Sequence, residues 1–432
     1  MGQSESAPKE APAEMVNGVS ASATAAQAAR PAFSSFDVVT MGPPDPILGI
    51  GKRFKADPSK DKVDVVVGAY RDDAGKPLVL NVVRKAEQRI VADLSRNKEY
   101  LPIAGDPAFC SATASFCFGA SAKALKEQRV ATVQALSGTG ALRVGAEFLF
   151  NFFPGATVFI SDPTWGNHFQ IFGNAGLRTA KYRYWDAKTR GLDFAGMMAD
   201  LGAAAPGSVV VLHVCSHNPT GVDPSAAQWQ QVLELCKSKQ LLPFFDSAYQ
   251  GFGSGDADKD AFAVRLFEQA GMPMLVAQSY AKNMGLYGER VGALNVVCPS
   301  SDARDKVMSR LELVIRAQYS NPPKHGAAIA ALILTDPQLN AEWRVELKAM
   351  TDRIKAMRAG LRKALEEQGA PGDWSFMTSQ IGMFAYTGLS SDQVATMEKQ
   401  SHIYMTSNGR ISMAGVTTDA IPRLSKAIRS VL

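Results

Sequence analysis

Lys282 lies in a stretch of small and polar residues, QSYAKNMGLYGERVG at 278–292, which follows an apolar, strand-like run. Gly285 and Gly288 disfavour a helix here, because each glycine costs about 1 kcal/mol relative to alanine in a helix interior. We therefore expect Lys282 at the end of a buried strand, in a tight loop whose glycines let the backbone approach a ligand. A lysine that loses water there either has a lowered pKa or forms a Schiff base with a carbonyl compound. A solvated loop lysine is the ordinary alternative, which Lys282 alone does not exclude.

Three further polar residues follow buried, strand-like runs. Ser137 follows RVATVQAL, Asn218 follows SVVVLHVCS, and Asp246 ends QLLPFFD. Near-continuous apolar strands that alternate with helical segments are typical of a parallel or mixed sheet with helices on both faces. Ligands bind such sheets beyond the carboxyl ends of the strands. We therefore expect these residues and Lys282 to converge on one ligand site.

The segment SGTG at 137–140 joins a strand to the start of a helix. Free backbone N–H groups and the helix dipole make such a start a phosphate site. Together with a strand-end lysine, a strand-end aspartate and an aromatic loop residue, this combination predicts a pyridoxal 5'-phosphate site. Lys282 would bind the aldehyde, Asp246 would keep the pyridine nitrogen protonated, and Trp165 could stack on the ring. The residues that could hold the phosphate are Ser137, Gly138, Thr139, Ser279 and Arg290.

The composition fits a soluble globular enzyme. The 432 residues suggest two or three domains, and 46% hydrophobic and 20% charged residues are ordinary values. The net charge of +5 is small for this length, and no basic block indicates nucleic acid. The five cysteines form no CxxC pair, which favours reduced thiols in a reducing compartment. No apolar run is long enough for a membrane span.

Residues 1–34 are rich in Ala, Ser, Pro and Glu and predict a disordered tail. Acidic residues outnumber basic ones there, which disfavours a mitochondrial transit peptide. The chain start fits the N-myristoylation pattern at Gly2, a short pattern that often matches by chance. We expect a cytoplasmic protein, with mitochondrial import or membrane association through a myristoyl group as alternatives.

Several further elements follow from the sequence pattern. We expect a strand at 63–70, helices at 80–94 and 302–317, and a loop that carries Trp165 and His168. A very long amphipathic helix follows the break at YSNPPKHG, and after it come strands and turns of a smaller α+β unit. The apolar positions of that helix step by three or four and indicate a packed face: Leu339, Trp343, Leu347, Met350, Ile354, Met357, Leu361 and Leu365.

Motif by motif, the chain resembles the aspartate aminotransferases, which are fold-type I pyridoxal-phosphate enzymes. The motifs that carry the resemblance span almost everything but the tail: VGAYR (67–71), EYLPI (99–103), SGTGALR (137–143), PTWGNH (163–168), HNPTG (217–221), FFDSAYQGF (244–252), the lysine stretch, SNPP (320–323), QIGMF (380–384) and NGRISMAG (408–415). The resemblance implies an α/β fold with a large domain at 75–344, built on a mostly parallel mixed sheet covered by helices. Residues 35–74 and 345–432 would form a smaller α+β domain.

The resemblance also implies a ping-pong transfer of the amino group from L-aspartate to 2-oxoglutarate. Lys282 would be the Schiff-base lysine and the base that moves the α-proton. Asp246 would pair with the pyridine nitrogen, with His168 supporting it. Tyr249 and Asn218 would hydrogen-bond the phenolic oxygen of the cofactor.

For the substrate, the resemblance implies that Arg410 clamps the α-carboxylate, near Trp165 and Asn218. Arg316 would bind the side-chain carboxylate and Tyr100 the cofactor phosphate, both from the partner subunit of a homodimer. A planar guanidinium matches a carboxylate bidentately, so two arginines would select a dicarboxylic substrate. Without the resemblance, Arg316 would be interpreted as a surface arginine at a helix end.

The loop that holds Gly68 would cover the bound substrate. Related aromatic aminotransferases keep the same arginine and move it aside, so a side activity on aromatic amino acids stays open. The chain departs from the family pattern at Ala281, Met284 and Ser412, where Ser, an aromatic residue and Asn are common. These departures remove no catalytic group, but they leave substrate breadth and rate open.

The sequence fits two other classes of function less well. For a nicotinamide dehydrogenase, GTG at 138–140 follows a strand and Asp162 ends the next one, but Arg143 stands where the third glycine is required. A non-catalytic scaffold would be expected to lack Lys282, Asp246 or Arg410, and the sequence has all three. The motifs indicate no metal site.

Overall fold

The structure is a computed structural model that describes residues 36–43, 45 and 48–432. The chain divides into two compact units, Met1–Pro44 and Asp45–Leu432. Of the first unit, the structure describes the short 3-10 helix Phe36–Val38 and the residues just after it. The predicted disordered tail at 1–34 and the modification pattern at Gly2 lie outside the described residues.

The helices of the second unit have these bounds: α1 (Leu48–Ala56), α2 (Asn81–Ala92), α3 (Pro107–Phe118), α4 (Lys123–Lys126), α5 (Ser137–Phe152), α6 (Asn167–Asn174), α7 (Phe194–Gly202), α8 (Ala226–Ser238), α9 (Ala257–Asp260), α10 (Phe262–Gln269), α11 (Ser301–Gln318), α12 (Lys324–Thr335), α13 (Pro337–Glu367), α14 (Phe376–Ser379), α15 (Ser391–Ser401) and α16 (Ile421–Ser430). The strands are β1 (Val63–Asp64), β2 (Val130–Leu136), β3 (Thr157–Asp162), β4 (Arg178–Arg183), β5 (Trp185–Asp186), β6 (Gly191–Leu192), β7 (Val209–His213), β8 (Leu242–Ser247), β9 (Met274–Ser279), β10 (Val291–Val297), β11 (Phe384–Tyr386), β12 (Ile403–Tyr404) and β13 (Arg410–Ser412).

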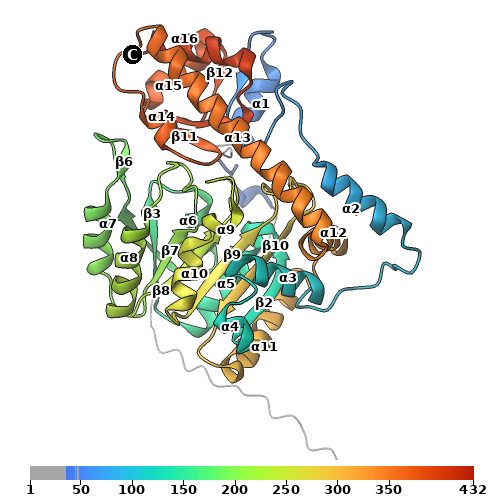
Figure 1. The fold of residues 1–432 in the computed structure, drawn as a ribbon. Coiled ribbons are helices and arrows are strands. Elements are labelled where there is room, and N and C mark those ends of the chain that lie inside the picture. The colour runs from blue at the N-terminus through green and yellow to red at the C-terminus, as the bar shows by residue number, and fades with distance from the viewer. Residues whose placement is uncertain (1–35, 44, 46–47) are drawn as a thin grey trace, which may run out of the picture. The chain divides into compact units, whose positions relative to one another are not determined.

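Within the described residues, seven strands form a mixed sheet in the order β2-β10-β9-β8-β7-β3-β4. Only β10 runs antiparallel to its neighbours β2 and β9, and the other pairs are parallel. The carboxyl ends of β7, β8 and β9 therefore meet at one edge of the sheet (Figure 1). This confirms the predicted α/β fold with a mostly parallel mixed sheet.

Helices cover both faces of this sheet. Val209 and Val211 of β7 pack into a hydrophobic cluster with α5, α6 and α11, whereas Val210 and Leu212 pack into a second cluster with α7, α8 and α10. Successive side chains of a strand point to opposite faces, so an unbroken apolar strand is buried on both sides. The helices on either face therefore hold the carboxyl ends of the strands in fixed positions.

The long helix α13 confirms the predicted amphipathic pattern, because every predicted apolar position from Leu339 to Leu365 is buried. Asp336 caps its start by accepting from the backbone N–H of Leu339. The helix runs from α12, beside the large sheet, to the C-terminal elements around α14 and α16 (Figure 1). Two small sheets, β1-β12 and β11-β13, lie among these C-terminal elements. The proposed division into 75–344 and a smaller domain stays a prediction.

The strand predicted at 63–70 is wrong beyond its first residues, because β1 ends at Asp64. After Asp64, the backbone carbonyls form hydrogen bonds with groups outside strand β12. The Val65 carbonyl accepts from the N–H of Ser412, and the Val66 carbonyl accepts from the guanidinium of Arg410. Because the Arg410 side chain takes the place of a backbone N–H donor at Val66, the residues after Asp64 form an irregular loop instead of a longer strand.

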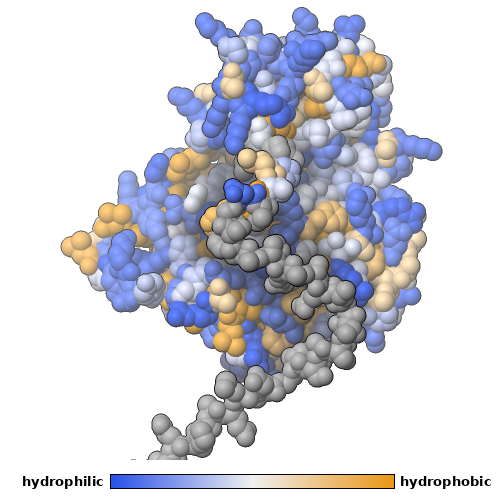
Figure 2. Space-filling model, turned by 180° about the vertical axis from the view of Figure 1, so that it is seen from behind, coloured by the Kyte–Doolittle hydropathy of each residue, from blue (hydrophilic) through white to orange (hydrophobic). Residues whose placement is uncertain are grey.

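His168 also differs from its predicted place, because it belongs to α6 rather than to a loop. Trp165 lies in the loop before that helix, as expected. No helix of the described residues is long and apolar enough to span a membrane. Seen from behind, hydrophilic residues cover most of the upper part of the second unit (Figure 2).

Candidate active site

A cavity of about 300 Å³ lies at the carboxyl edge of the large sheet. Strand ends, the N-terminus of α5, the loop after β1 and the start of β13 all contribute to its wall. The structure thus brings together most of the residues that the sequence singled out: Gly68, Ser137, Gly138, Thr139, Trp165, Asn218, Asp246, Tyr249, Ser279, Lys282, Arg290 and Arg410.

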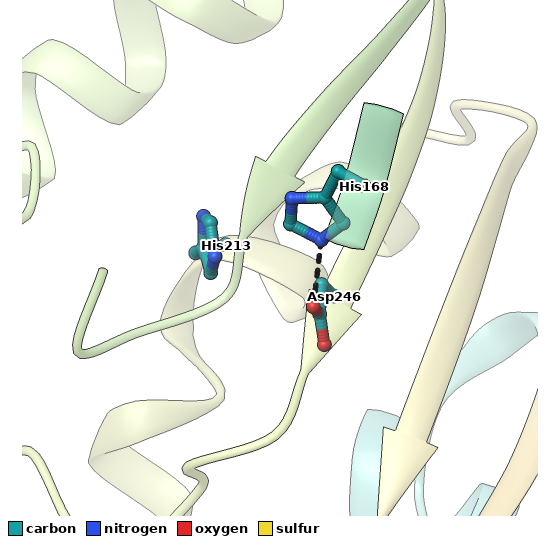
Figure 3. A group of neighbouring side chains, drawn as sticks. All are labelled: His168, His213 and Asp246. Atoms are coloured by element: carbon teal, nitrogen blue, oxygen red, sulfur yellow. Dashed lines mark hydrogen bonds and ion pairs between the residues drawn. The ribbon is translucent and has the colours of Figure 1, made fainter. Parts of the chain in front are cut away.

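Asp246 sits near the end of β8, and His168 holds it from behind (Figure 3). The Nε2 atom of His168 lies 3.0 Å from Oδ2 of Asp246, and Nδ1 lies 2.9 Å from the hydroxyl of Thr164. Because a carboxylate only accepts, Nε2 carries the proton of this bond. Burial raises the pKa of Asp246, but the hydrogen bond from His168, with further contributions from neighbouring residues, outweighs burial and brings the pKa below its usual value. Asp246 is therefore a buried carboxylate ion.

His213 lies beside this pair, because the register of β7 and β8 places it directly opposite Asp246. Both of its ring nitrogens are buried, and among the described residues neither has a hydrogen-bond partner. Burial, with the charge of His168 adding to it, lowers the pKa of His213 to about 3, so the ring is neutral. The ligand atoms of the trio lie within 4.8 Å of one another. Since His168 is already bonded on both ring nitrogens, we assign it to holding Asp246 rather than to binding a metal ion.

Lys282 follows β9 in a turn that ends at Gly285, whose φ of +65° a residue with a side chain rarely adopts. The lysine nitrogen lies 5.3 Å from the ring centroid of Tyr249. Burial lowers the pKa of Lys282, and the attraction of Asp246 offsets this only in part. Removal from water therefore favours the neutral amine, which is the nucleophilic form. Lys282 thus lies just after a buried strand, in a tight turn, where the sequence predicted it.

Arg410, Asn218 and Tyr249 form a chain of hydrogen bonds across the cavity. Arg410 donates from Nη1 to Oδ1 of Asn218 over 3.2 Å, and Asn218 donates from Nδ2 to the hydroxyl of Tyr249, also over 3.2 Å. Nη2 of Arg410 donates to the Val66 carbonyl over 2.8 Å. Among the described residues, Nε of Arg410 has no partner although it is buried. The cavity thus offers a fixed guanidinium with a donor left for an anion.

The N-terminus of α5 forms the opposite end of the cavity. No side chain caps this helix, so its first N–H groups are left for a ligand. The hydroxyls of Ser137 and Ser279 lie 2.9 Å apart, and a Cβ on Gly138 would lie 3.3 Å from Cβ of Ser279. Arg290 lines the same cavity, with its guanidinium bonded to the carbonyl of Tyr287. This end suits a phosphate group.

The residues present fit pyridoxal 5'-phosphate. Oδ1 of Asp246 is buried and has no hydrogen-bond partner among the described residues, while Oδ2 is held by His168. A buried carboxylate oxygen without a donor is costly, and a protonated ring nitrogen would supply that donor. With Lys282 for the aldehyde and the start of α5 for the phosphate, each end of the cofactor has a matching group.

Three predicted site residues do not line this cavity, and one of them is His168, which lies behind Asp246. Tyr100 is 82% exposed in the loop before α3. Arg316, in the last turn of α11, is exposed and donates to the hydroxyl of Ser320. Neither lines the cavity of its own chain. Their proposed reach into a partner's site stays a prediction.

Seven lining residues were not predicted as site residues, and three of them carry ring side chains: His213, Tyr287 and Phe384. His213 lies within an unbroken apolar strand, and its sequence gives no signal of its place. Tyr287 and Phe384 lie within the lysine stretch and the QIGMF motif, but the sequence did not single them out as site residues. They reach the cavity through contacts with segments far away in the chain. The Tyr287 hydroxyl accepts from the backbone N–H of Tyr70 over 2.9 Å, and Phe384 packs over Arg410 with Cζ of the guanidinium 4.2 Å from its ring centroid.

Comparison with known proteins agrees with this geometry. Residues 60–428 match the family described as aminotransferase class I and II. The chain is 57% identical to an aspartate aminotransferase, cytoplasmic, of Oryza sativa subsp. japonica, over 92% of this chain and 98% of the relative. It is 56% identical to aspartate aminotransferase 3, chloroplastic, of Arabidopsis thaliana, over 92% and 89%. A crystal structure of an aromatic-amino-acid aminotransferase from Burkholderia pseudomallei, covalently bound to pyridoxal phosphate, superposes with a TM-score of 0.90 at 46% identity, over 92% of this chain and all of that one. The chain belongs to the class I and II aminotransferase family.

Proposed function

We propose that the chain is an aspartate aminotransferase that uses pyridoxal 5'-phosphate. It would transfer the amino group of L-aspartate to 2-oxoglutarate and release oxaloacetate and L-glutamate. The observation that carries this proposal is the buried Oδ1 of Asp246, which has no partner among the described residues and belongs to a residue that lines the same cavity as Lys282. The names of relatives more than half identical to the chain support the substrate class.

When bound, the cofactor supplies an electron-withdrawing ring that stabilises negative charge at the substrate α-carbon. Oδ1 of Asp246 would accept a hydrogen bond from the protonated ring nitrogen. His168 holds the other carboxylate oxygen, Oδ2. Tyr249 and Asn218 line the same cavity as Lys282 and would donate to the phenolic oxygen of the cofactor. These contacts set the orientation of the ring before the substrate arrives.

Lys282 has two tasks. In its neutral form it attaches the cofactor aldehyde through Nζ. When the substrate amine has taken its place, the freed Nζ would act as the base that accepts the α-proton. Burial favours the neutral amine that both tasks need.

Substrate selection would come from two arginines. Arg410 binds the α-carboxylate with its unpaired Nε and its Nη donors. Arg316 and Tyr100 of one chain would complete the site of the other in a homodimer, binding the side-chain carboxylate and the cofactor phosphate. Support for this comes from their exposed positions, away from the cavity of their own chain.

A side activity on aromatic amino acids is a second candidate. It is favoured by the apolar part of the cavity wall, which includes Val67, Trp165 and Phe384. The similar solved structure named as an aromatic-amino-acid aminotransferase supports it as well.

The first test records the absorption spectrum of the protein with pyridoxal phosphate, before and after L-aspartate is added. We expect the band of the lysine-bound cofactor to disappear as oxaloacetate appears. A protein that never acquires the band would contradict the cofactor assignment. A band that responds to an aromatic amino acid and not to aspartate would change the substrate class and keep the chemistry.

The shared site is tested by mixing two inactive variants, Arg316→Ala and Lys282→Ala, under conditions that exchange subunits. In a hybrid dimer one site would carry both defects and the other neither. We therefore expect activity to return on mixing, and its absence in a verified hybrid would contradict the shared site.

The proposed compartment is the cytoplasm. Similar relatives carry both cytoplasmic and chloroplastic names, and the acid-rich tail supports the former. Imaging of the tagged chain tests the compartment. The intact mass of the protein isolated from its own cells tests N-myristoylation at Gly2.

A further inference from the structure

A second cavity, of about 730 Å³, lies behind the segment that covers the active site. The two cavities share one residue, Val67, and are otherwise lined by different side chains. Its wall comes from α1, from β1 and the turn after it, and from the segment before and within α16. The described lining residues are Gly51, Lys52, Phe54, Lys55, Lys62, Val63, Asp64, Val67, Arg71, Gly75, Pro77, Gly415, Thr417, Ala420 and Arg423.

Basic side chains dominate this wall. Lys52, Lys55, Lys62, Arg71 and Arg423 stand against a single carboxylate, Asp64, among the described lining residues. These five basic groups less one acid give a local excess of four, whereas the whole chain has an excess of only five. The excess of positive charge around this one cavity is therefore nearly as large as the net charge of the whole protein.

The fold does little to neutralise these groups. Lys62 donates to the carbonyls of Phe54 and Asp57, at 3.0 and 2.6 Å, and so has no carboxylate partner. Arg423 has one distant partner, Asp61, at 3.6 Å on the exposed surface. Such an exposed pair contributes about 0–1 kcal/mol.

The other three cations have even fewer contacts. Within the described part of the chain, no side-chain hydrogen bond or ion pair is made by Lys52, Lys55 or Arg71. The one acid of the wall is itself engaged, because Oδ1 of Asp64 accepts from the N–H of Val66 over 2.9 Å. Like charges from separate elements that face one cavity repel one another unless an anion lies between them.

We propose that this cavity binds a small molecule that carries two or more phosphate groups. The guanidinium groups of Arg71 and Arg423 suit bidentate contacts to phosphate oxygens, and the lysines add compact charges around them. The cations come from separate elements around a space far larger than a single phosphate needs, so several linked phosphates match the array better than one. The ligand would join α1, the segment after β1 and α16.

The test is a calorimetric titration of the cofactor-loaded protein with inorganic tripolyphosphate. Excess maleate, a dicarboxylate, is present to occupy Arg410, and 0.15 M salt suppresses weak surface binding. We expect one tripolyphosphate per chain. Because binding itself is measured, the result does not depend on which amino acid the enzyme uses.

A pair of charge-matched variants decides whether the cavity is the site. Lys55→Glu with Arg423→Glu reverses two exposed cations of the wall, and we expect the affinity to fall at least tenfold. Lys399→Glu with Lys426→Glu makes the same change of net charge at exposed positions outside the cavity and should bind within twofold of the unchanged protein.

Two results would overturn the proposal. These are no binding to the protein whose active site holds cofactor and maleate, or an equal loss of affinity in both double variants. Circular dichroism of each variant shows whether it is folded before the titration is interpreted.

Discussion

Gly68 faces the ring of Phe384 so closely that a Cβ on Gly68 would lie 2.6 Å from Cζ of that ring. The same ring packs over the guanidinium of Arg410 and meets the ring of Tyr249 edge-on, with centroids 6.0 Å apart. Gly68→Ala must therefore displace Phe384 and disturb the carboxylate site. We expect kcat/KM for aspartate to fall about tenfold or more, because misplaced binding groups cost at least about 1.4 kcal/mol in the transition state.

The contact can be tested by a second substitution. Leucine lacks the distal ring atoms that the new methyl group would meet, so Gly68→Ala with Phe384→Leu should recover part of the loss relative to Gly68→Ala alone. Kinetics of both single variants and the double variant give the coupling between the positions. Purely additive losses would contradict the steric explanation.

Asp246→Asn replaces a buried carboxylate by an amide that cannot stabilise a protonated ring nitrogen. We expect kcat to fall by roughly 10²–10⁴, the equivalent of about 3–5 kcal/mol for a broken buried charge pair. Thr164→Val is the milder comparison, because it removes only the hydroxyl behind His168. Stopped-flow spectra of the half reaction would measure both, and equal effects would contradict the assignment of Asp246 to the ring nitrogen.

Lys282→Ala removes the amine that attaches the cofactor and moves the α-proton. We expect no covalent attachment and a loss of turnover of at least several powers of ten. Borohydride treatment followed by mass spectrometry detects attachment independently of activity. Unaltered turnover in this variant would refute the mechanism.

Arg410→Lys keeps the charge and loses the planar fork. It also leaves Oδ1 of Asn218 and the carbonyl of Val66 without their donor. We expect KM for aspartate to rise by about 10–100-fold, since a charge-assisted hydrogen bond contributes about 1.5–3 kcal/mol. An unchanged KM, measured in initial-rate experiments, would place the α-carboxylate elsewhere.

The stability of the fold should decrease in acid because of two buried histidines. Burial lowers the pKa of His213 to about 3, and that of His217 well below its usual value. Below about pH 6.5 the unfolded chain takes up protons that the folded chain does not, so the free energy of unfolding falls with the pH. Asp223 and Asp260 act in the opposite sense, because burial raises the pKa of both, that of Asp223 to about 6. Asp57, whose pKa is lowered to about 2 chiefly by the backbone N–H of Ser59, adds to the effect of the histidines.

His213→Leu isolates one of these protons, because neither ring nitrogen makes a hydrogen bond that the variant would lose. Between pH 4 and 6 the slope of unfolding free energy against pH should become shallower by about 1.4 kcal/mol per pH unit. Urea unfolding at several pH values measures it. His325→Leu, at an exposed histidine, is the matched control and should leave the slope as it was. An unchanged slope in His213→Leu would mean that this ring is charged in the folded protein.

Local signals in the sequence predicted much of the fold. The period of apolar residues gave α13 its buried face from Leu339 to Leu365, because helix geometry alone decides which positions align. The apolar runs that end near Ser137, Asp246 and Lys282 predicted the edge of the sheet at which ligands bind. These inferences succeeded because strands buried on both faces have an unmistakable composition and a known site of ligand binding.

Other features depended on strand register and on contacts between distant segments. The pairing of β7 with β8 puts His213 beside Asp246, although nothing in an apolar strand marks that histidine. The strand after Val63 stops early because the side chain of Arg410, distant in sequence, takes the carbonyl of Val66. The sequence by itself determined which residues have the chemistry of an aminotransferase and near which strand ends they stand. Only the tertiary structure decided which oxygen of Asp246 is left unpaired, and that Lys55, Arg71 and Arg423 face one cavity, because both depend on packing between elements far apart in the chain.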